Sequence, residues 1–196
     1  MKKALLGCIV VVVAVVLLLG LAVAGSYNNL VRLDEAVKSA WGQVENVYQR
    51  RADLVPNLVE TVKGAAAFER DTFTAVTEAR AKVGQMNFGS VPNPEQFRQF
   101  QQAQDGLSSA LSRLLVVVER YPDLKATQNF QDLQVQLEGT ENRITVERKR
   151  FNDAAQAFNT ARRRFPTVLV AAFLGFPERP YFQSTPGSDR PPQVKF

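Results

Sequence analysis

Two carboxylates, Glu138 and Glu141, are the residues whose type and spacing first suggest chemistry. Carboxylates on facing helices can hold a pair of iron ions, but that design also requires histidine in a Glu-x-x-His arrangement. The chain contains no histidine, so it lacks the commonest general base and the commonest protein ligand of zinc and iron. We therefore predict that Glu138 and Glu141 are structural and that the protein uses no metal or other cofactor.

Arg51 has a chemical consequence of a different kind, because it occupies a core-facing position of a helical repeat. A buried guanidinium is tolerated only when it is paired or reaches solvent. If the first and last long helices pair in antiparallel fashion, Arg51 comes level with Thr140 and Glu141. This geometry predicts a partly buried ion pair of Arg51 with Glu141 or Glu138 that sets the register of the two helices. The alternative is that the arginine side chain extends to solvent.

Arrangements typical of enzymes are missing from the sequence. It contains no nucleophile elbow, no phosphate-binding glycine loop and no cysteines at metal-binding spacing, and its single cysteine is Cys8. We therefore interpret the chain as a protein that is not an enzyme.

Basic residues are concentrated between residues 143 and 164, where seven lysines and arginines face two acids. Nucleic-acid binding is disfavoured, because the aromatic residues of this segment belong to its apolar stripe and the chain carries a membrane tether. One interpretation of Arg162, Arg163 and Arg164 is that they complement the carboxyl end of a helix. The other is that they contact anionic headgroups, each contributing about 1 kcal/mol.

The elements that position these residues begin with an uncharged apolar run, residues 4–25. A helix of this length spans roughly 33 Å, against a hydrocarbon core of about 30 Å. We predict that residues 1–25 form a transmembrane anchor that contacts the lipid bilayer through residues 4–25. The alternatives are a signal peptide cleaved after Ala24 and a lipoprotein anchored through Cys8.

The charges that flank the apolar run bear on its orientation. Lys2 and Lys3 precede the run, whereas residues 26–31 are uncharged. The positive-inside rule therefore favours a single-pass protein of the cell membrane with a cytoplasmic amino terminus and an extracytoplasmic body. Over wider flanks, Arg32 and Lys38 make the charge count equal.

Four amphipathic segments follow the apolar run, at about residues 27–63, 68–85, 94–121 and 130–165. Their apolar residues recur in alternating steps of three and four, which is typical of helices that pack with a left-handed twist, as in coiled coils. Short connections favour antiparallel neighbours. The predicted fold class is therefore all-α, with an N-terminal transmembrane helix followed by an antiparallel up-and-down four-helix bundle at residues 26–166.

Two positions in these segments carry specific expectations. Pro56 lies inside the first amphipathic helix, where its ring removes a hydrogen bond to the carbonyl of Ala52. We expect a kink that the long helix tolerates, and the alternative is a helix break or a binding notch. Phe165 is the last member of the inward-facing stripe of the fourth segment, so we expect its side chain to face the core. The stripe consists of Phe130, Leu133, Leu137, Thr140, Ile144, Glu147, Phe151, Ala154, Phe158, Ala161 and Phe165.

The carboxyl-terminal part divides into an apolar segment, residues 167–183, and a tail, residues 184–196, whose proline and charge predict disorder. The apolar stretch 167–176 is too short to span a bilayer. It either caps the open end of the bundle or lies in the membrane interface together with Phe165, Tyr181 and Phe182. In the second case we expect Phe173 and Phe176 to contact the membrane surface beside Arg162–Arg164.

Several motifs of this chain resemble the LemA family over roughly residues 26–196. The strongest is the stretch 48–64, YQRRADLVPNLVETVKG, followed by YPDLKA at 121–126, LEGTENRI at 137–144, and the Phe-Asn pairs at 151–152 and 158–159. The resemblance implies a bacterial protein with one amino-terminal membrane helix and a four-helix bundle. It implies no agreed biochemical activity.

These observations predict a membrane-anchored scaffold or adaptor for another membrane protein. The alternative is a lipid-interacting or membrane-shaping protein that uses Arg162–Arg164 and the apolar segment after Pro166. The sequence leaves the identity of the partner and the oligomeric state open.

Overall fold

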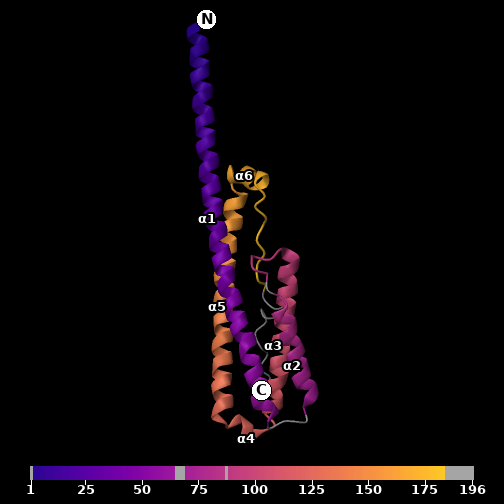
Figure 1. Cartoon of the computed structure of the whole chain (residues 1–196). Helices are drawn as coiled ribbons and strands as arrows, with labels where there is room; N and C mark the ends of the chain where they lie inside the picture. The colour runs from indigo at the N-terminus through magenta and orange to yellow at the C-terminus, as the bar shows by residue number, and fades with distance from the viewer. Residues whose placement is uncertain (1, 65–68, 87, 184–196) are drawn as a thin grey trace, which may run out of the picture.

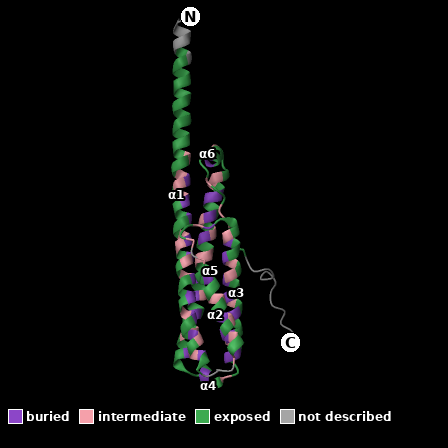
Figure 2. Ribbon diagram, turned by 45° about the vertical axis from the view of Figure 1, so that its right-hand side comes forward, coloured by how far each residue is buried: buried purple, intermediate pink, exposed green. Residues whose placement is uncertain are grey.

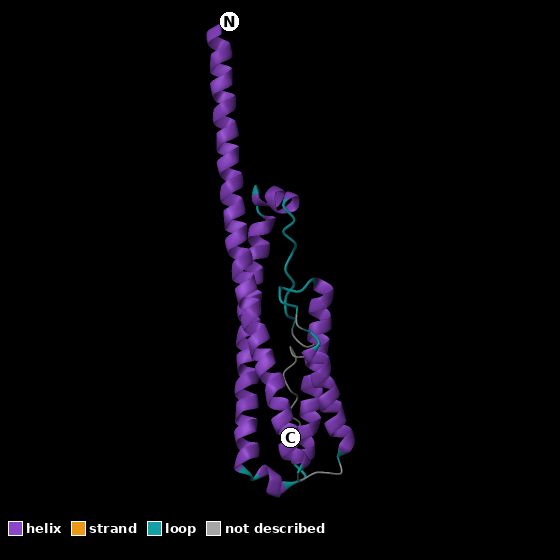
Figure 3. Cartoon of the chain, in the orientation of Figure 1, coloured by secondary structure: helices purple, strands orange, loops and turns teal. Residues whose placement is uncertain are grey.

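The computed structural model describes residues 2–64, 69–86 and 88–183 (Figure 1). Every regular element in these ranges is a helix: α1 (Lys2–Lys63), α2 (Arg70–Gly84), α3 (Pro94–Val118), α4 (Pro122–Lys125), α5 (Gln128–Arg163) and α6 (Thr167–Phe173). Figure 3 draws the described residues between the helices as loops and turns. The predicted all-α class is confirmed. The predicted tail at 184–196 and the predicted start of the second helix at residue 68 lie outside the described residues.

Helix α1 continues from the apolar run into the body without a break, over 62 residues. Among the described residues it is the one helix long and apolar enough to cross a membrane, and none of its apolar window is buried. Figure 2 shows this change along α1, from an exposed amino-terminal part to a part with buried residues. The apolar run and the first wall of the core are therefore parts of one continuous helix.

Helices α1 and α5 form the main pairing of the body, while α2 packs on α3 and on α1. The contacts between α1 and α5 run in opposite directions along the two helices. Arg51 of α1 meets Glu141 of α5, and Trp41 lies 5.6 Å from Phe151 between ring centroids. Figure 1 shows α5 returning beside α1 toward the exposed part of α1.

Two hydrophobic clusters fill the body, one on each side of a polar layer. The distal cluster, farther from the apolar run, includes Ala52, Val55, Leu58, Val62, Phe73, Val76, Leu107, Leu111, Leu114, Phe130 and Leu137. The proximal cluster includes Leu30, Val37, Trp41, Val44, Tyr48, Phe97, Phe100, Ile144, Phe151, Phe158, Val170 and Phe182. Buried Arg51, Gln104 and Thr140 lie between the two clusters on α1, α3 and α5, and we call them the polar layer.

Pro56 lies within α1, and the helix runs through it. The proline lacks an N–H, so the carbonyl of Ala52 loses its usual partner in the helix. Arg80 of α2 donates from Nε to that carbonyl at 3.0 Å. The contact replaces the lost hydrogen bond and ties α2 to α1, so a local defect in one helix becomes a tertiary contact.

The helix ends follow local sequence chemistry. Asn93 caps α3 by accepting hydrogen bonds from the backbone of Glu95 and Gln96, and Gln96 accepts in return from the backbone of Asn93. Pro94 occupies the first turn, where its missing N–H has no consequence. The Thr127 side chain caps α5 by accepting one hydrogen bond, from the backbone N–H of Phe130.

One expected core position is wrong. Helix α5 ends at Arg163, and the backbone of Arg164 is extended, with φ −77° and ψ 145°. The helical periodicity therefore does not reach Phe165, whose side chain is 81% exposed. Between α3 and α5, residues Pro122–Lys125 form the short helix α4.

Candidate functional site

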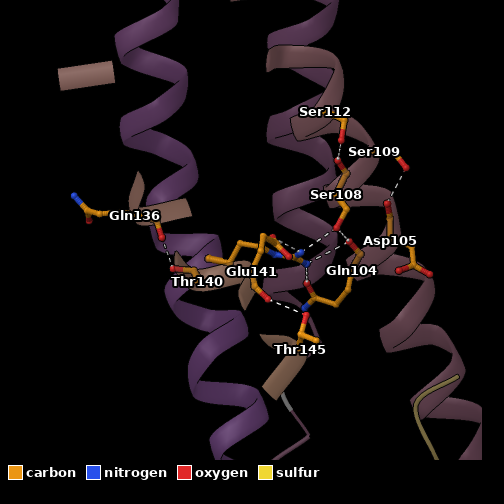
Figure 4. Close-up of polar contacts among 10 residues, drawn as sticks. Gln104, Asp105, Ser108, Ser109, Ser112, Gln136, Thr140, Glu141 and Thr145 are labelled. Carbon is orange, nitrogen blue, oxygen red and sulfur yellow. Dashed lines mark hydrogen bonds and ion pairs between the residues drawn. The ribbon is translucent and has the colours of Figure 1, made fainter. Parts of the chain in front are cut away.

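Arg51 is the centre of a buried hydrogen-bonded network that connects three helices. Its Nη1 donates to the Ser108 hydroxyl and to the Glu141 carboxylate, both at 2.9 Å. Its Nη2 donates to the backbone carbonyl of Gln104 at 3.3 Å and also to the Gln104 side-chain oxygen. Figure 4 shows Gln104, Ser108 and Glu141 converging from α3 and α5.

The two ends of the ion pair differ in their exposure to solvent. The Arg51 side chain is 2% exposed, whereas the Glu141 side chain is 44% exposed. The guanidinium also lies 5.0 Å from the centroid of the Tyr48 ring, a cation–π contact on its buried side. Because one partner keeps its hydration, the pair avoids much of the desolvation penalty of two buried charges.

The structure separates the two sequence-predicted carboxylates. Glu141 contacts Arg51, whereas Glu138 is exposed and accepts a hydrogen bond from Gln134 at 3.0 Å. Thr140 lies in the polar layer but donates to the carbonyl of Gln136 in its own helix. We propose that the Arg51–Glu141 contact sets the register of α1 against α5.

A cavity of about 240 Å³ lies beside the network, lined in part by Glu45, Tyr48 and Gln104. Burial raises the pKa of the Glu45 carboxyl, although contacts with Trp41 and the Phe88 backbone partly oppose this. Burial likewise raises the pKa of the Tyr48 hydroxyl, against the opposing charges of Arg148 and Arg51. Within the described chain, no three histidine, cysteine, aspartate or glutamate residues gather as metal ligands would.

Other residues of the chain partner two of the three arginines at residues 162–164. Arg162 donates from Nε to the carbonyl of Phe176 at 2.7 Å, and Arg163 forms an ion pair with Glu178. Arg164 is exposed. The structure therefore brings Arg162 and Phe176 together.

The apolar residues of the following segment divide between the core and the surface. Val170 and Ala171 of α6 are buried, whereas the Phe173 side chain is 90% exposed. Phe176 is half-buried and lies between Tyr27 and Phe158, with ring centroids 6.2 Å away in both cases. Capping and exposure thus coexist in one short segment, and contact of its exposed side with a membrane remains a prediction.

Residues 177–183 form a segment whose role sequence reasoning missed, and we call it the strap. Figure 3 shows the loop after α6 running back along the body. Phe182, expected among the residues at the membrane interface, is instead buried against Trp41, Phe97 and Phe151. Its backbone is held by Asn152. The signal was present in the repeated Phe-Asn pairs of α5, but nothing in the sequence showed which segment the asparagines contact.

The strap is tied to α1 by an ion pair between Arg179 and Asp34, both nearly buried. Burial acts to raise the pKa of the Asp34 carboxyl, but hydrogen bonds and charge from Arg179 and Lys38 outweigh it, so the pKa lies below its ordinary value. Lys38 approaches Asp34 from the exposed side at 3.0 Å. The carboxylate is therefore held ionised in the folded protein.

A candidate membrane-spanning helix that continues into an all-helical body defines the class of this chain, a membrane-associated helical protein. A sequence model of the LemA family matches residues 40–196, which include the polar layer and the strap. The chain belongs to the LemA family.

The chain is similar to proteins with two different names. The magnetosome protein MamQ of Magnetospirillum gryphiswaldense is 27% identical over 190 residues, which cover 86% of this chain and 70% of that protein. MamQ 2 of Paramagnetospirillum magneticum is 27% identical over 184 residues, covering 84% and 67% respectively. Protein LemA of Metamycoplasma hominis is 24% identical over 161 residues, covering 82% and 70%.

Replacing Arg51 tests the network. We expect Arg51→Ala to lower the free energy of unfolding by about 3 kcal/mol, because Gln104 and Ser108 lose their partner while Glu141 can return to water. Exposed Arg50 provides the matched control, and Arg50→Ala should change stability by under about 0.5 kcal/mol. Denaturant titration of the full chain in detergent micelles measures both. A loss below about 0.5 kcal/mol for Arg51→Ala would show that the network does not hold the helices together.

The Asp34–Arg179 pair predicts a pH dependence. The folded pKa of Asp34 lies below its ordinary 3.8, so its contribution is present above that pH and is lost as pH falls through the folded value. We expect Asp34→Asn to be less stable than the parent by about 2 kcal/mol from pH 5 to 7, with the difference shrinking below pH 4. Arg179→Gln should follow the same curve, because the pair requires both charges. A stability difference that persists unchanged down to pH 2.5 would contradict the assignment.

Proposed function

We propose that this protein is a membrane-tethered scaffold or adaptor for another membrane protein, with no enzymatic activity of its own. In this proposal, one span is followed by an antiparallel up-and-down four-helix bundle with a left-handed twist. The observation that carries it is the continuity of α1, which leaves no flexible linker between the apolar run and the core. A body joined to the apolar run by a continuous helix keeps a fixed orientation relative to a bilayer, which suits a protein that positions a partner.

The names of the relatives are consistent with this role. MamQ is named for the magnetosome and not for a reaction, and the LemA relative is named without an activity. Glu45 is the one carboxylate among the described residues that line the cavity. A single carboxylate does not make an acid–base pair or a nucleophile–base pair. For orientation, the lysines before the apolar run favour a cytoplasmic amino terminus and an extracytoplasmic body.

Breaking the continuity of α1 tests the scaffold proposal in cells. A seven-residue Gly/Ser insertion between Gly25 and Ser26 uncouples the body from the span, whereas seven alanines preserve the helix and return close to the same face after about two turns. We expect in-cell crosslinking with mass spectrometry to recover a recurrent membrane-protein partner with the parent and the alanine variant. The Gly/Ser variant should lose those crosslinks while its body melts at the same temperature. Repeated recovery of no partner by the parent protein would contradict the proposal.

A second candidate function is interaction with lipid, favoured by the exposed apolar side chains next to the span. Phe165, Leu169 and Phe173 point outward at the end of the body where α6 packs on α1. Arg164 adds a charge that could meet anionic headgroups. Burying the apolar face of α6 in the headgroup region while the span crosses the bilayer would shape the membrane around the protein.

Tryptophan fluorescence tests this second function. In proteoliposomes of the full chain with brominated anionic lipid, we expect Phe173→Trp to be strongly quenched relative to Val116→Trp, a control at an exposed position of the distal body. Trp41 is buried and gives the same background in both. Adding Arg163→Gln and Arg164→Gln should reduce the quenching and its dependence on salt. Equal quenching of the two tryptophan variants would exclude membrane contact by α6.

A further inference from the structure

In each of the two Phe-Asn pairs of α5, the phenylalanine packs in the core and the asparagine binds the strap. Phe151 and Phe158 are fully buried. The Asn159 carboxamide accepts from the backbone N–H of Arg179 at 2.9 Å and donates to the carbonyl of Arg179 at 2.8 Å. Asn152 does the same with Phe182, at 2.8 and 3.0 Å. Each asparagine therefore offers the strap backbone the donor and acceptor that a neighbouring β-strand would offer.

The spacing of these contacts follows from elementary geometry. Asn152 and Asn159 are seven residues apart on a helix, a distance of about 10.5 Å. Arg179 and Phe182 are three residues apart, and an extended chain covers about 10 Å in three residues. The rising numbers of the strap pair with falling numbers of α5, so an extended peptide fits when it runs antiparallel to the helix. The four backbone contacts accept any residue except proline at the two paired positions, and Asn159 Nδ2 also donates to the Tyr181 hydroxyl at 2.9 Å.

Side-chain selectivity comes from two pockets at the same spacing. The Arg179 guanidinium meets the Asp34 carboxylate and lies 5.4 Å from the centroid of the Phe158 ring. The Phe182 ring lies 4.6 Å from Phe97 and 5.5 Å from Phe151 between centroids. The Arg148 guanidinium lies 4.8 Å from the centroid of the same ring. One pocket thus selects an arginine, and the next selects an aromatic ring three residues later.

We propose that Asn152, Asn159, Asp34 and the aromatic pocket of Phe182 form a peptide-binding groove that the strap occupies in cis. A segment of the partner protein can displace the strap and bind in its place. This segment is extended and carries an arginine and, three residues later, a phenylalanine. The proposal rests on the adaptor function, for which it names the recognition chemistry. The backbone contacts, the carboxylate and the ring pocket are all met by such a segment.

The tether of the strap decides which partners can compete. A segment joined to its site by a short connection has an effective concentration on the order of millimolar, so a dilute soluble peptide displaces it poorly. A partner confined to the same membrane gains a comparable advantage, and the exchange then approaches balance. An occupant without an aromatic ring would leave a cavity among Trp41, Phe97 and Phe151, which disfavours it. The groove therefore selects membrane-bound partners with the arginine–aromatic pattern.

Peptide binding to the full chain in anionic nanodiscs tests the groove. The probe is a fluorescein-labelled peptide with the sequence of residues 177–183, measured by fluorescence anisotropy. We expect Phe182→Ala, which weakens the strap, to bind the probe at least 10-fold more tightly than the parent protein. Gln183→Ala, an exposed neighbour, is the matched control and should bind like the parent. If Phe182→Ala unfolds below the assay temperature, Arg179→Glu is a second variant in which the strap is released from the groove, because it loses the ion pair with Asp34.

Specificity is tested with altered probes and a charge exchange. Probes with the arginine replaced by glutamate, or the phenylalanine by alanine, should bind Phe182→Ala at least 10-fold more weakly. Adding Asp34→Arg should reverse the preference in favour of the glutamate probe, a result that a purely structural role of Asp34 would not produce. The groove proposal is overturned if the probe binds neither Phe182→Ala nor Arg179→Glu. It is also overturned if adding Asn152→Ala and Asn159→Ala to Phe182→Ala leaves the affinity for the probe unchanged. Crosslinks to a partner elsewhere on the body would then leave the adaptor function standing.

Discussion

The buried guanidinium of Arg51 is the constraint on which the body of this protein depends. It lies between two apolar clusters, and a charge in that position requires partners at fixed places. Gln104 and Ser108 of α3 and Glu141 of α5 supply them. A shift of α5 by one turn, about 5.4 Å, would break the contact with Glu141 and bring Leu137 or Ile144 to the level of Thr140 in the polar layer. Apolar contacts tolerate such a shift more readily, so the polar layer adds a specificity that the two clusters lack.

The alignment of α1 with α5 has consequences at the other end of the body. With Arg51 opposite Glu141, residues near Asp34 come level with the second half of α5, where Asn152 and Asn159 lie. The strap can then bridge the two helices, with Arg179 bound to both Asp34 and Asn159. The same alignment places Phe176 next to Tyr27, close to the end of the apolar run. One buried contact is thus linked through two rigid helices to the region nearest the proposed membrane.

Prediction from the sequence succeeded where the burial of a residue follows from the periodicity of its own helix. It failed where the contacts of a residue are supplied by another element of the fold. The stripe of α5 predicted the burial of Phe130, Phe151 and Phe158, but it failed at Phe165, where the helix had already ended. Pro56 predicted that the carbonyl of Ala52 lacks its helical partner. The sequence did not predict the donor that replaces it, because Arg80 lies on another helix. Antiparallel pairing put Glu141 level with Arg51 and left Glu138, about one turn away, as the alternative, because only the placement of α5 along and around its axis decides which carboxylate reaches Arg51.

The sequence by itself determined the apolar run, the helical class, the faces of the long helices and the membership of the LemA family. These features depend on periodicity and local chemistry, which a linear pattern carries in full. Only the tertiary structure decided that the strap folds back and that Phe182 enters the core. The strap has no helical or strand periodicity, and its backbone is held by side chains about 20 to 30 residues away in the chain. These hydrogen bonds join the strap to α5 after the chain has reversed direction, so no local pattern encodes them.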